Sequence, residues 1–163
     1  QDYQYESRPD SRTRHSLFWQ TKYHLTEDVI DLSYRYMTDD WGIKSHTVDL
    51  RYRFELGNDS YLEPNVRFYT QTAADFYHYF LVQGQATPQF ASADPRLGQF
   101  DATTFGMKYG KALSKDSEFS VRVEQYAQKG NSTPSEAIGQ LKTQNLFPDL
   151  NALVVQFGYS FSF

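Results

Sequence analysis

Few residues in this chain could carry out chemistry, and their spacing argues against a conventional active site. Ser45 and His46 are adjacent, and a lipid hydrolase would need both side chains in one site. Neighbouring residues of a strand point to opposite faces, so this pair cannot form a catalytic dyad. Cysteine is absent, which excludes thiolate catalysis and cysteine-ligated metal. We therefore expect no enzymatic activity, and a lipid hydrolase is the weakest of the functions considered.

Acidic residues in two expected loops are the candidate ligands for a hard cation such as calcium. Asp39, Asp40 and Asp75 could meet at one rim of the molecule, but the Asp-Asp-Trp-Gly run at 39–42 lacks a full oxygen-ligand spacing pattern. Turn and loop capping are the favoured roles for these carboxylates. The histidines are scattered, with no ligand spacing between them. The sequence thus predicts no metal site and no cofactor. The four histidines are His15, His24, His46 and His78.

Charged side chains that share one face of consecutive expected strands are the best functional candidates. They admit two interpretations. In a narrow barrel they would pair and fill the interior as a structural ion-pair network, because unpaired buried charge is costly. In a wider barrel the same residues would line water and favour the passage of anions. The candidate lumen-facing charges are Arg35, Arg51, Arg53, Arg67, Arg122, Asp49 and Glu63.

The elements that would position these residues are strands, because apolar and polar residues alternate with period two. At the C-terminus, Leu153, Val155 and Phe157 fall on one face, and Gln156 and Gly158 on the other. The same alternation predicts seven strands. We expect a bulge at Pro64, because proline cannot donate a hydrogen bond to a ladder. The Asp-Phe-Tyr-His-Tyr-Phe-Leu-Val run at 75–82 predicts an extended hairpin, with partner docking as the alternative. The predicted strands cover 13–25, 29–38, 44–56, 60–72, 101–112, 117–128 and 153–163.

The connections alternate in length, which is typical of outer-membrane barrels with short periplasmic turns and long extracellular loops. Tight turns are expected at 26–28, 57–59 and 114–116. Longer connections cover 39–43, about 73–100 and about 129–150, and residues 1–12 form a lead-in. No run of apolar residues approaches the roughly 18–20 that a spanning helix needs. We expect one all-β domain over 1–163.

The aromatic content helps to choose between a membrane barrel and a soluble β-domain. Among 163 residues are thirteen Tyr, thirteen Phe and two Trp, 17 % of the chain. Many lie on the apolar faces near the ends of strands, where rings favour a membrane interface. In a soluble sandwich or lipocalin-like barrel the apolar faces would point inward, and each buried tyrosine hydroxyl would need a partner. The pattern favours an antiparallel transmembrane β-barrel with apolar faces toward lipid.

The end of the chain resembles the C-terminal assembly signal of bacterial outer-membrane barrels, which end in Phe after aromatics at alternate positions. This resemblance implies recognition by the barrel assembly machinery, contact with outer-membrane lipid, and a periplasmic C-terminus in the bacterial outer membrane. The matching positions are Phe157, Tyr159, Phe161 and Phe163.

A second resemblance covers most of the chain. The segments 5–15, 34–36, 39–47, 67–71 and 73–77 resemble the bacterial domain-of-unknown-function 3570 family. Its members look like outer-membrane barrels with no established activity, and they are usually longer than this chain. The resemblance implies the C-terminal part of a larger barrel, with 7–8 strands in this chain. An even strand number with periplasmic ends likewise requires an ascending strand before 13–25, from residues 1–12 or from upstream of Gln1.

Three functions remain open at this point. The first is an outer-membrane pore or conduit with a charged lumen, and the second is a non-conducting barrel that anchors its loops or a partner protein. The third and weakest is an outer-membrane lipid hydrolase. The formal net charge of −4 gives no general footprint for nucleic acid. The sequence names no solute and no partner protein.

Overall fold

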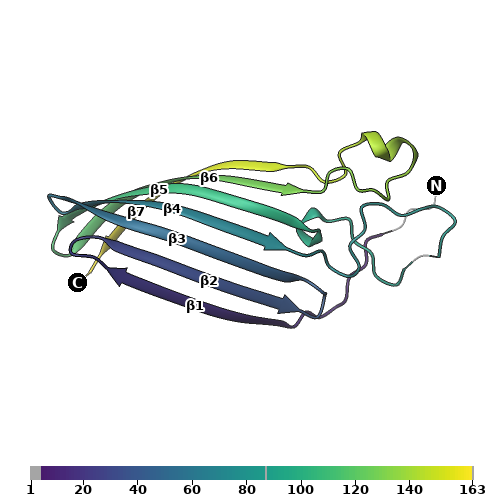
Figure 1. Cartoon of the computed structure of the whole chain (residues 1–163), viewed down its shortest axis with the longest axis horizontal. Helices are drawn as coiled ribbons and strands as arrows, with labels where there is room; N and C mark the ends of the chain where they lie inside the picture. Colours follow the sequence, from purple (N-terminus) through teal and green to yellow (C-terminus); the bar gives the residue numbers. More distant parts are fainter. Residues whose placement is uncertain (1–4, 87, 163) are drawn as a thin grey trace.

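The computed structural model describes residues 5–86 and 88–162, and these residues are all-β apart from two short 3₁₀ helices, η1 (Pro95–Leu97) and η2 (Gly139–Thr143). One sheet contains the seven strands of this described part, side by side in sequence order (Figure 1). Every neighbouring pair is antiparallel. The strands are β1 (Arg14–His24), β2 (Val29–Asp39), β3 (Lys44–Gly57), β4 (Ser60–Gln71), β5 (Phe100–Ser114), β6 (Ser117–Gly130) and β7 (Leu150–Phe161).

The seven predicted strands and their connections are confirmed, with bounds that differ by a few residues at most. Tight connections join β1 to β2, β3 to β4 and β5 to β6, and they lie at one end of the sheet, the turn end (Figure 1). Asn58 and Asp59 take the left-handed conformation, with φ of 50° and 56°. A two-residue hairpin connection favours that conformation because it matches the twist of the flanking strands.

The predicted bulge at Pro64 is wrong. Arg51 pairs with Asn65 and Phe54 with Leu62, so the β3–β4 register is the same on both sides of Pro64. Proline lacks an N–H, so it removes one hydrogen bond from the ladder without inserting a residue. The ladder continues at the next residues that have an N–H. The register shifts instead between Glu55 and Gly57, beside the hairpin turn.

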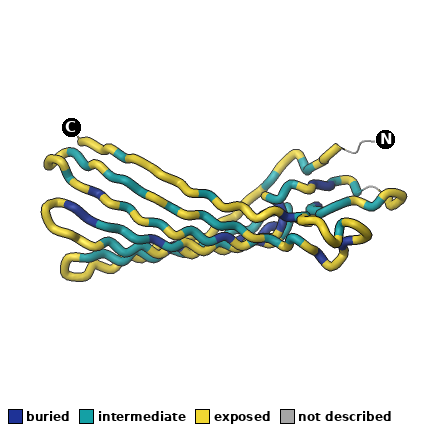
Figure 2. Tube along the Cα trace, turned by 90° about the horizontal axis from the view of Figure 1, so that it is seen from above, coloured by how far each residue is buried: buried dark blue, intermediate teal, exposed yellow. Residues whose placement is uncertain are grey.

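The polar face of the sheet is more buried than the apolar face, the reverse of the usual arrangement in a soluble protein. The six ladders put the predicted polar positions of all seven strands on one face, the polar face. Polar side chains there are buried, such as Asp49 with 6 % exposure, while the opposite apolar face is open, with Leu17 at 68 %. Figure 2 shows the strands largely exposed or intermediate. Exposed apolar-face residues include Trp19, Tyr23, Leu50, Phe68, Phe105, Met107, Leu153 and Val155.

The sheet is open in the described residues, so the closed barrel of the sequence prediction is not present in them. β1 and β7 are its two edges, and both run from the loop end toward the turn end (Figure 1). Direct pairing between these two edges would therefore be parallel. Antiparallel closure requires an odd number of additional strands between them.

The conventional apolar core lies in the loops rather than between layers of sheet. Connections 72–99 and 131–149 meet at the loop end, opposite the turns (Figure 1). Ile43, Ala74, Phe76 and Leu97 form a buried cluster there. Phe147 is fully buried, and a Cβ added at Gly98 or Gly130 would overlap its ring. We call this packed loop structure the cap. No helix among the described residues is long and apolar enough to cross a membrane.

The N-terminal lead-in is docked against the cap. Ser7 and Ala91 exchange backbone hydrogen bonds of 3.1 and 2.9 Å. Arg12 binds the Asp39 carboxylate, with its Nη2 2.5 Å from Oδ2, and its guanidinium lies 4.6 Å from the ring centroid of Trp41. The lead-in therefore tethers the start of β1 to the end of β2 and to the connection between β4 and β5.

The burial of Phe147 predicts that it holds the 131–149 connection in the cap. Phe147→Ala should destabilise this region by about 3–5 kcal/mol, because it removes a ring that no other described side chain replaces. Hydrogen exchange read by mass spectrometry should show faster exchange over 131–149 and unchanged exchange in β2 and β3. Ile138→Ala, at a position with 50 % exposure, is the matched control. Equal protection in both variants would contradict the assignment of Phe147 as the anchor.

Candidate functional site

The polar face of the sheet forms a hollow of about 770 Å³ that receives side chains from all seven strands. Four of the seven predicted lumen-facing charges line it, namely Arg35, Asp49, Arg51 and Arg67. The other three, Arg53, Glu63 and Arg122, lie on the same face outside the hollow, toward the turn end. Sequence alternation therefore placed all seven on one face, and the register decided which of them meet.

Asp49 is the centre of the charged hollow. Its Oδ1 accepts a hydrogen bond of 2.9 Å from Arg51 Nε, and its Oδ2 accepts one of 2.7 Å from Arg67 Nε. Arg51 lies two residues along the same strand, and Arg67 is the direct cross-strand partner of Asp49. Bonds from guanidinium to carboxylate are charge-assisted and stronger than neutral ones. The buried carboxylate is thus compensated by two cations.

A second set of polar groups joins β4 to β6. Arg122 lies 3.6 Å from both Glu63 and Glu124, and Asn65 Nδ2 donates to Glu124 Oε1 over 3.2 Å. Gly106 lies between Asn65 and Glu124, and a Cβ at that position would overlap both side chains. The buried Asn65 Oδ1 has no hydrogen-bond partner within the part of the chain that the structure describes.

The third set lies near the turn end and is built around an aromatic ring. The Arg53 guanidinium lies 3.6 Å from the ring centroid of Tyr61, and its Nε is 2.5 Å from Glu55 Oε1. The Tyr61 hydroxyl donates to Glu118 over 2.7 Å, and Lys108 Nζ is 3.6 Å from the same carboxylate. Cation–π contact and ion pairs together satisfy both cations here.

Arg35 differs from the other candidate arginines. Its guanidinium lies 5.3 Å from the centroid of the Phe18 ring, and it forms no ion pair with any described residue. It also lines the hollow. Arg35 is therefore the candidate arginine that lines the hollow without an acidic partner among the described residues.

The residues considered for catalysis and metal binding have structural partners. Ser45 is buried on the polar face, whereas His46 lies on the apolar face with its Nδ1 2.7 Å from the Tyr34 hydroxyl. Asp39 Oδ1 accepts bonds of 3.0 and 2.9 Å from the backbone N–H groups of Trp41 and Ile43. These contacts agree with the favoured capping role. Within residues 5–86 and 88–162, no three acidic or histidine side chains gather as a metal site would need.

The predicted C-terminal assembly signal lies along the edge of the sheet. Phe157, Tyr159 and Phe161 belong to β7 and are 71 %, 62 % and 64 % exposed. They project from the apolar face, as the alternation predicts. Phe163 is outside the described residues.

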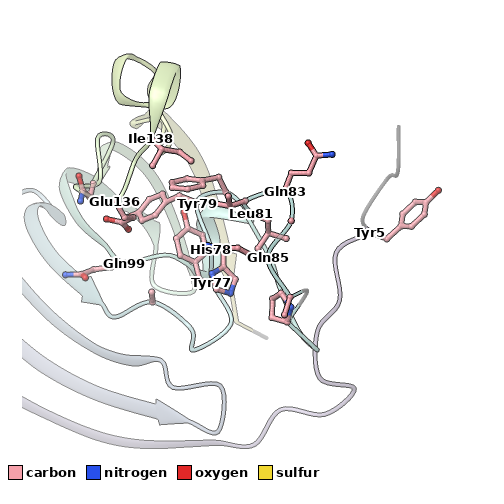
Figure 3. A pocket seen from close by; sticks show the side chains of 17 residues that line it. Tyr5, Tyr77, His78, Tyr79, Leu81, Gln83, Gln85, Gln99, Glu136 and Ile138 are labelled. Carbon is pink, nitrogen blue, oxygen red and sulfur yellow. The ribbon is translucent and has the colours of Figure 1, made fainter.

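Sequence reasoning missed a pocket at the loop end, because no local pattern reports how loops pack. The loop-end pocket has a volume of about 1,530 Å³ and is lined by Tyr77, Tyr79, Gln99, Glu136 and residues near them (Figure 3). The extended hairpin predicted for 75–82 is wrong, since these residues form turns and one isolated bridge from Tyr77 to Ser92. The sequence signal that could have indicated this pocket is the presence of three tyrosine or phenylalanine residues among the four residues 77–80.

Two groups at the loop end have shifted pKa values with clear causes. Burial, with added repulsion from Tyr79 and Asp94, raises the pKa of Tyr77 to about 12. The Tyr77 phenol is therefore a neutral hydrogen-bond donor. Hydrogen bonds from Arg96 and Arg8 outweigh burial and lower the pKa of Asp94 to about 2, which keeps this carboxylate charged beside the lead-in.

Comparison with known proteins gives one family. The model of a family described as a protein of unknown function, DUF3570, matches residues 1–161, and the match covers nearly the whole chain. A search of curated proteins found no match.

The pairing around Asp49 predicts a specific loss of stability. Asp49→Asn should lower the free energy of unfolding by about 1–3 kcal/mol, because two guanidiniums lose their shared carboxylate. Urea unfolding in detergent micelles, followed by tryptophan fluorescence, measures the change. Glu55→Gln is the control, since the Arg53–Glu55 pair is more than one-third exposed on both sides and such pairs contribute about 0–1 kcal/mol. Equal losses in both variants would argue against Asp49 as the centre of the network.

Proposed function

The chain belongs to this DUF3570 family, and from that premise we propose that its sheet is part of the wall of an outer-membrane β-barrel that acts as a pore or conduit. The polar face lines the lumen, and the apolar face meets lipid. The observation that carries this proposal is the inverted burial of the sheet. Asp49 and Asn65 are buried on one face while Leu17, Phe105 and Leu153 are at least 60 % exposed on the other.

Lipid is the cover that best fits the apolar face. Soluble proteins rarely expose contiguous apolar patches of more than a few hundred Å², and here exposed apolar side chains recur on β1 and on every strand from β3 to β7, while the apolar side chains of β2 are partly exposed. No described segment packs over this face away from the cap. Alternating apolar and polar positions are the expected pattern of a membrane strand.

The edges of the sheet support closure by further strands. Unpaired backbone N–H and C=O groups are too costly in lipid, so a spanning sheet must close. A second copy in the same membrane orientation would place its β1 beside β7 as a parallel pair. An odd number of further antiparallel strands avoids this seam and gives the even total of bacterial barrels. The short turns and the C-terminal signal then lie on the periplasmic side, where the assembly machinery acts.

Conduction depends on whether the charged hollow contains water. In barrels of about eight strands side chains fill the interior, and wider barrels leave a channel. The open curvature of seven strands around a hollow of about 770 Å³ supports the wider case. Arg35, without an acidic partner among the described residues, would then give the lumen a modest preference for anions.

A second candidate function is a non-conducting barrel that presents its cap. The cap has its own buried cluster around Ile43 and Phe76 and is tied to the lead-in through Arg12 and Asp39. Five of the six cations among Arg51, Arg53, Arg67, Lys108, Arg122 and Arg35 are paired with acids, as a filled interior requires. Planar-bilayer conductance separates the two functions.

Membrane placement predicts a face-specific effect on assembly. Leu50→Arg should prevent stable assembly, because a charge facing the middle of the bilayer costs about 2–4 kcal/mol. Heat-modifiable migration and resistance of membranes to urea extraction measure assembly. Ser33→Arg is the matched control, since Leu32 pairs with Leu50 and its neighbour Ser33 faces the hollow. Normal assembly of Leu50→Arg, or equal failure of both variants, would contradict the proposed orientation.

The pore function predicts a change in ion selectivity at Arg35. Arg35→Glu should shift the reversal potential in a salt gradient toward cations, with roughly a twofold change in the permeability ratio. No ion pair between described residues is broken by this substitution. Lys111→Glu makes the same change of charge on the opposite face and should leave the reversal potential unchanged. Absence of single-channel currents in the assembled wild-type protein would favour the non-conducting barrel.

A further inference from the structure

The loop-end pocket combines aromatic rings with neutral polar groups. Tyr77 and Tyr79 pack edge to face with ring centroids 5.1 Å apart. In Figure 3 they lie together with Glu136 at one side of the pocket, and Ile138 lies above them. Gln99, the residue before β5, lines the same pocket. The rings and the amide group therefore come from segments far apart in sequence.

Several polar side chains of this pocket form no hydrogen bond within the described part of the protein. The hydroxyls of Tyr77 and Tyr79 and the amide of Gln99 have no hydrogen-bond partner among the described residues. The charged hollow behaves differently, because Asp49 and its arginines satisfy one another. Tyr77 and Tyr79 are half-buried and Gln99 is exposed, so water or a ligand can complete the hydrogen bonds of these groups. The loop-end pocket thus presents polar groups that are available for hydrogen bonds with a ligand.

The charge of the pocket limits the class of ligand. None of its described lining residues is Lys or Arg, and apart from the tyrosines its ionisable groups are His78 and Glu136. Sites for phosphate or carboxylate need charge-assisted donors, usually arginine. The Tyr77 hydroxyl also stays protonated at neutral pH. The pocket therefore suits a neutral ligand with many hydroxyl groups.

We propose that the loop-end pocket binds a neutral oligosaccharide. A pyranose ring has a flat C–H face that packs on the electron-rich face of a tyrosine ring, and a rim of hydroxyls that bonds amides and carboxylates. Tyr79 supplies the stacking surface, and Gln99 and Glu136 supply the polar contacts. Aromatic lining with a few placed polar groups is the general construction of small-molecule sites.

The size and place of the pocket match an extended ligand. Its volume of about 1,530 Å³ exceeds the roughly 300–1,000 Å³ typical of sites for one small molecule. Several sugar units fit such a space. The pocket opens at the loop end, and only the expectation that this end faces outside the cell rests on the proposed function. Binding itself requires no conduction.

Calorimetric titration of the full chain in detergent micelles tests the proposal. The probes are maltohexaose and cellohexaose, with inositol hexakisphosphate as an anionic comparison. We expect at least one hexasaccharide to bind saturably and the polyanion to bind more weakly or not at all. Absence of binding to both hexasaccharides by folded protein, or tighter binding of the polyanion, would overturn the proposal.

Variants locate the binding site. Tyr79→Ala should weaken hexasaccharide binding about tenfold or more through loss of the stacking ring, and Gln99→Ala should weaken it several-fold. Tyr23→Ala, on the apolar face near the turn end with 64 % exposure, is the matched control and should bind as the wild type does. Hydrogen exchange in the cap checks folding of each variant. Unchanged affinity in both pocket variants would place the sugar elsewhere and overturn the assignment.

The binding result can be separated from the pore function. Saturable hexasaccharide binding without channel currents would keep this inference and remove the pore. Channel currents without hexasaccharide binding would keep the pore and remove this inference.

Discussion

Inter-strand register is the constraint on which the rest of this structure depends. A slip of one residue in any ladder would move a whole strand's polar set to the other face. The observed registers keep six ladders in phase, so that Asp49, Asn65 and Arg122 share one face across β3, β4 and β6. Asp49 and Arg67 are direct partners across β3–β4, and their ion pair stabilises this register relative to registers shifted by one residue. The register is therefore favoured by ion pairs on the polar face and by the apolar side chains that adjoin one another on the opposite face.

The two ends of the sheet are stabilised by different physics. At the turn end, Asn58 and Asp59 adopt left-handed backbone conformations in a two-residue connection. At the loop end, long connections bury Phe76 and Phe147 in a small core, and the lead-in is held by Arg12 on Asp39. Long loops cost closure entropy, and the apolar burial in the cap offsets that cost. A sheet without a second layer thus keeps ordered loops at one end.

Polar groups serve two separate purposes in this molecule. On the sheet they neutralise one another, as Arg51 and Arg67 do around Asp49, because a buried charge needs a partner. In the loop-end pocket they are left open, as in Tyr79 and Gln99. The first arrangement maintains the shape of the polar face, and the second offers contacts to a ligand. The proposed transport and recognition functions would therefore use different parts of the molecule.

The sequence alone determined the strands, the tight turns, the face of each strand residue and the family, because period-two alternation and turn residues act locally. It placed Asp49 and Arg67 on one face, but only the register made them partners and left Arg35 without an acid. It could not place Phe147 between Gly98 and Gly130, or turn the 75–82 run into a pocket wall, because loop packing depends on contacts between distant segments. The effect of Pro64 was likewise decided by the ladder around it. The two unpaired edges, β1 and β7, follow from the spatial order of the strands, which is a property of the tertiary structure.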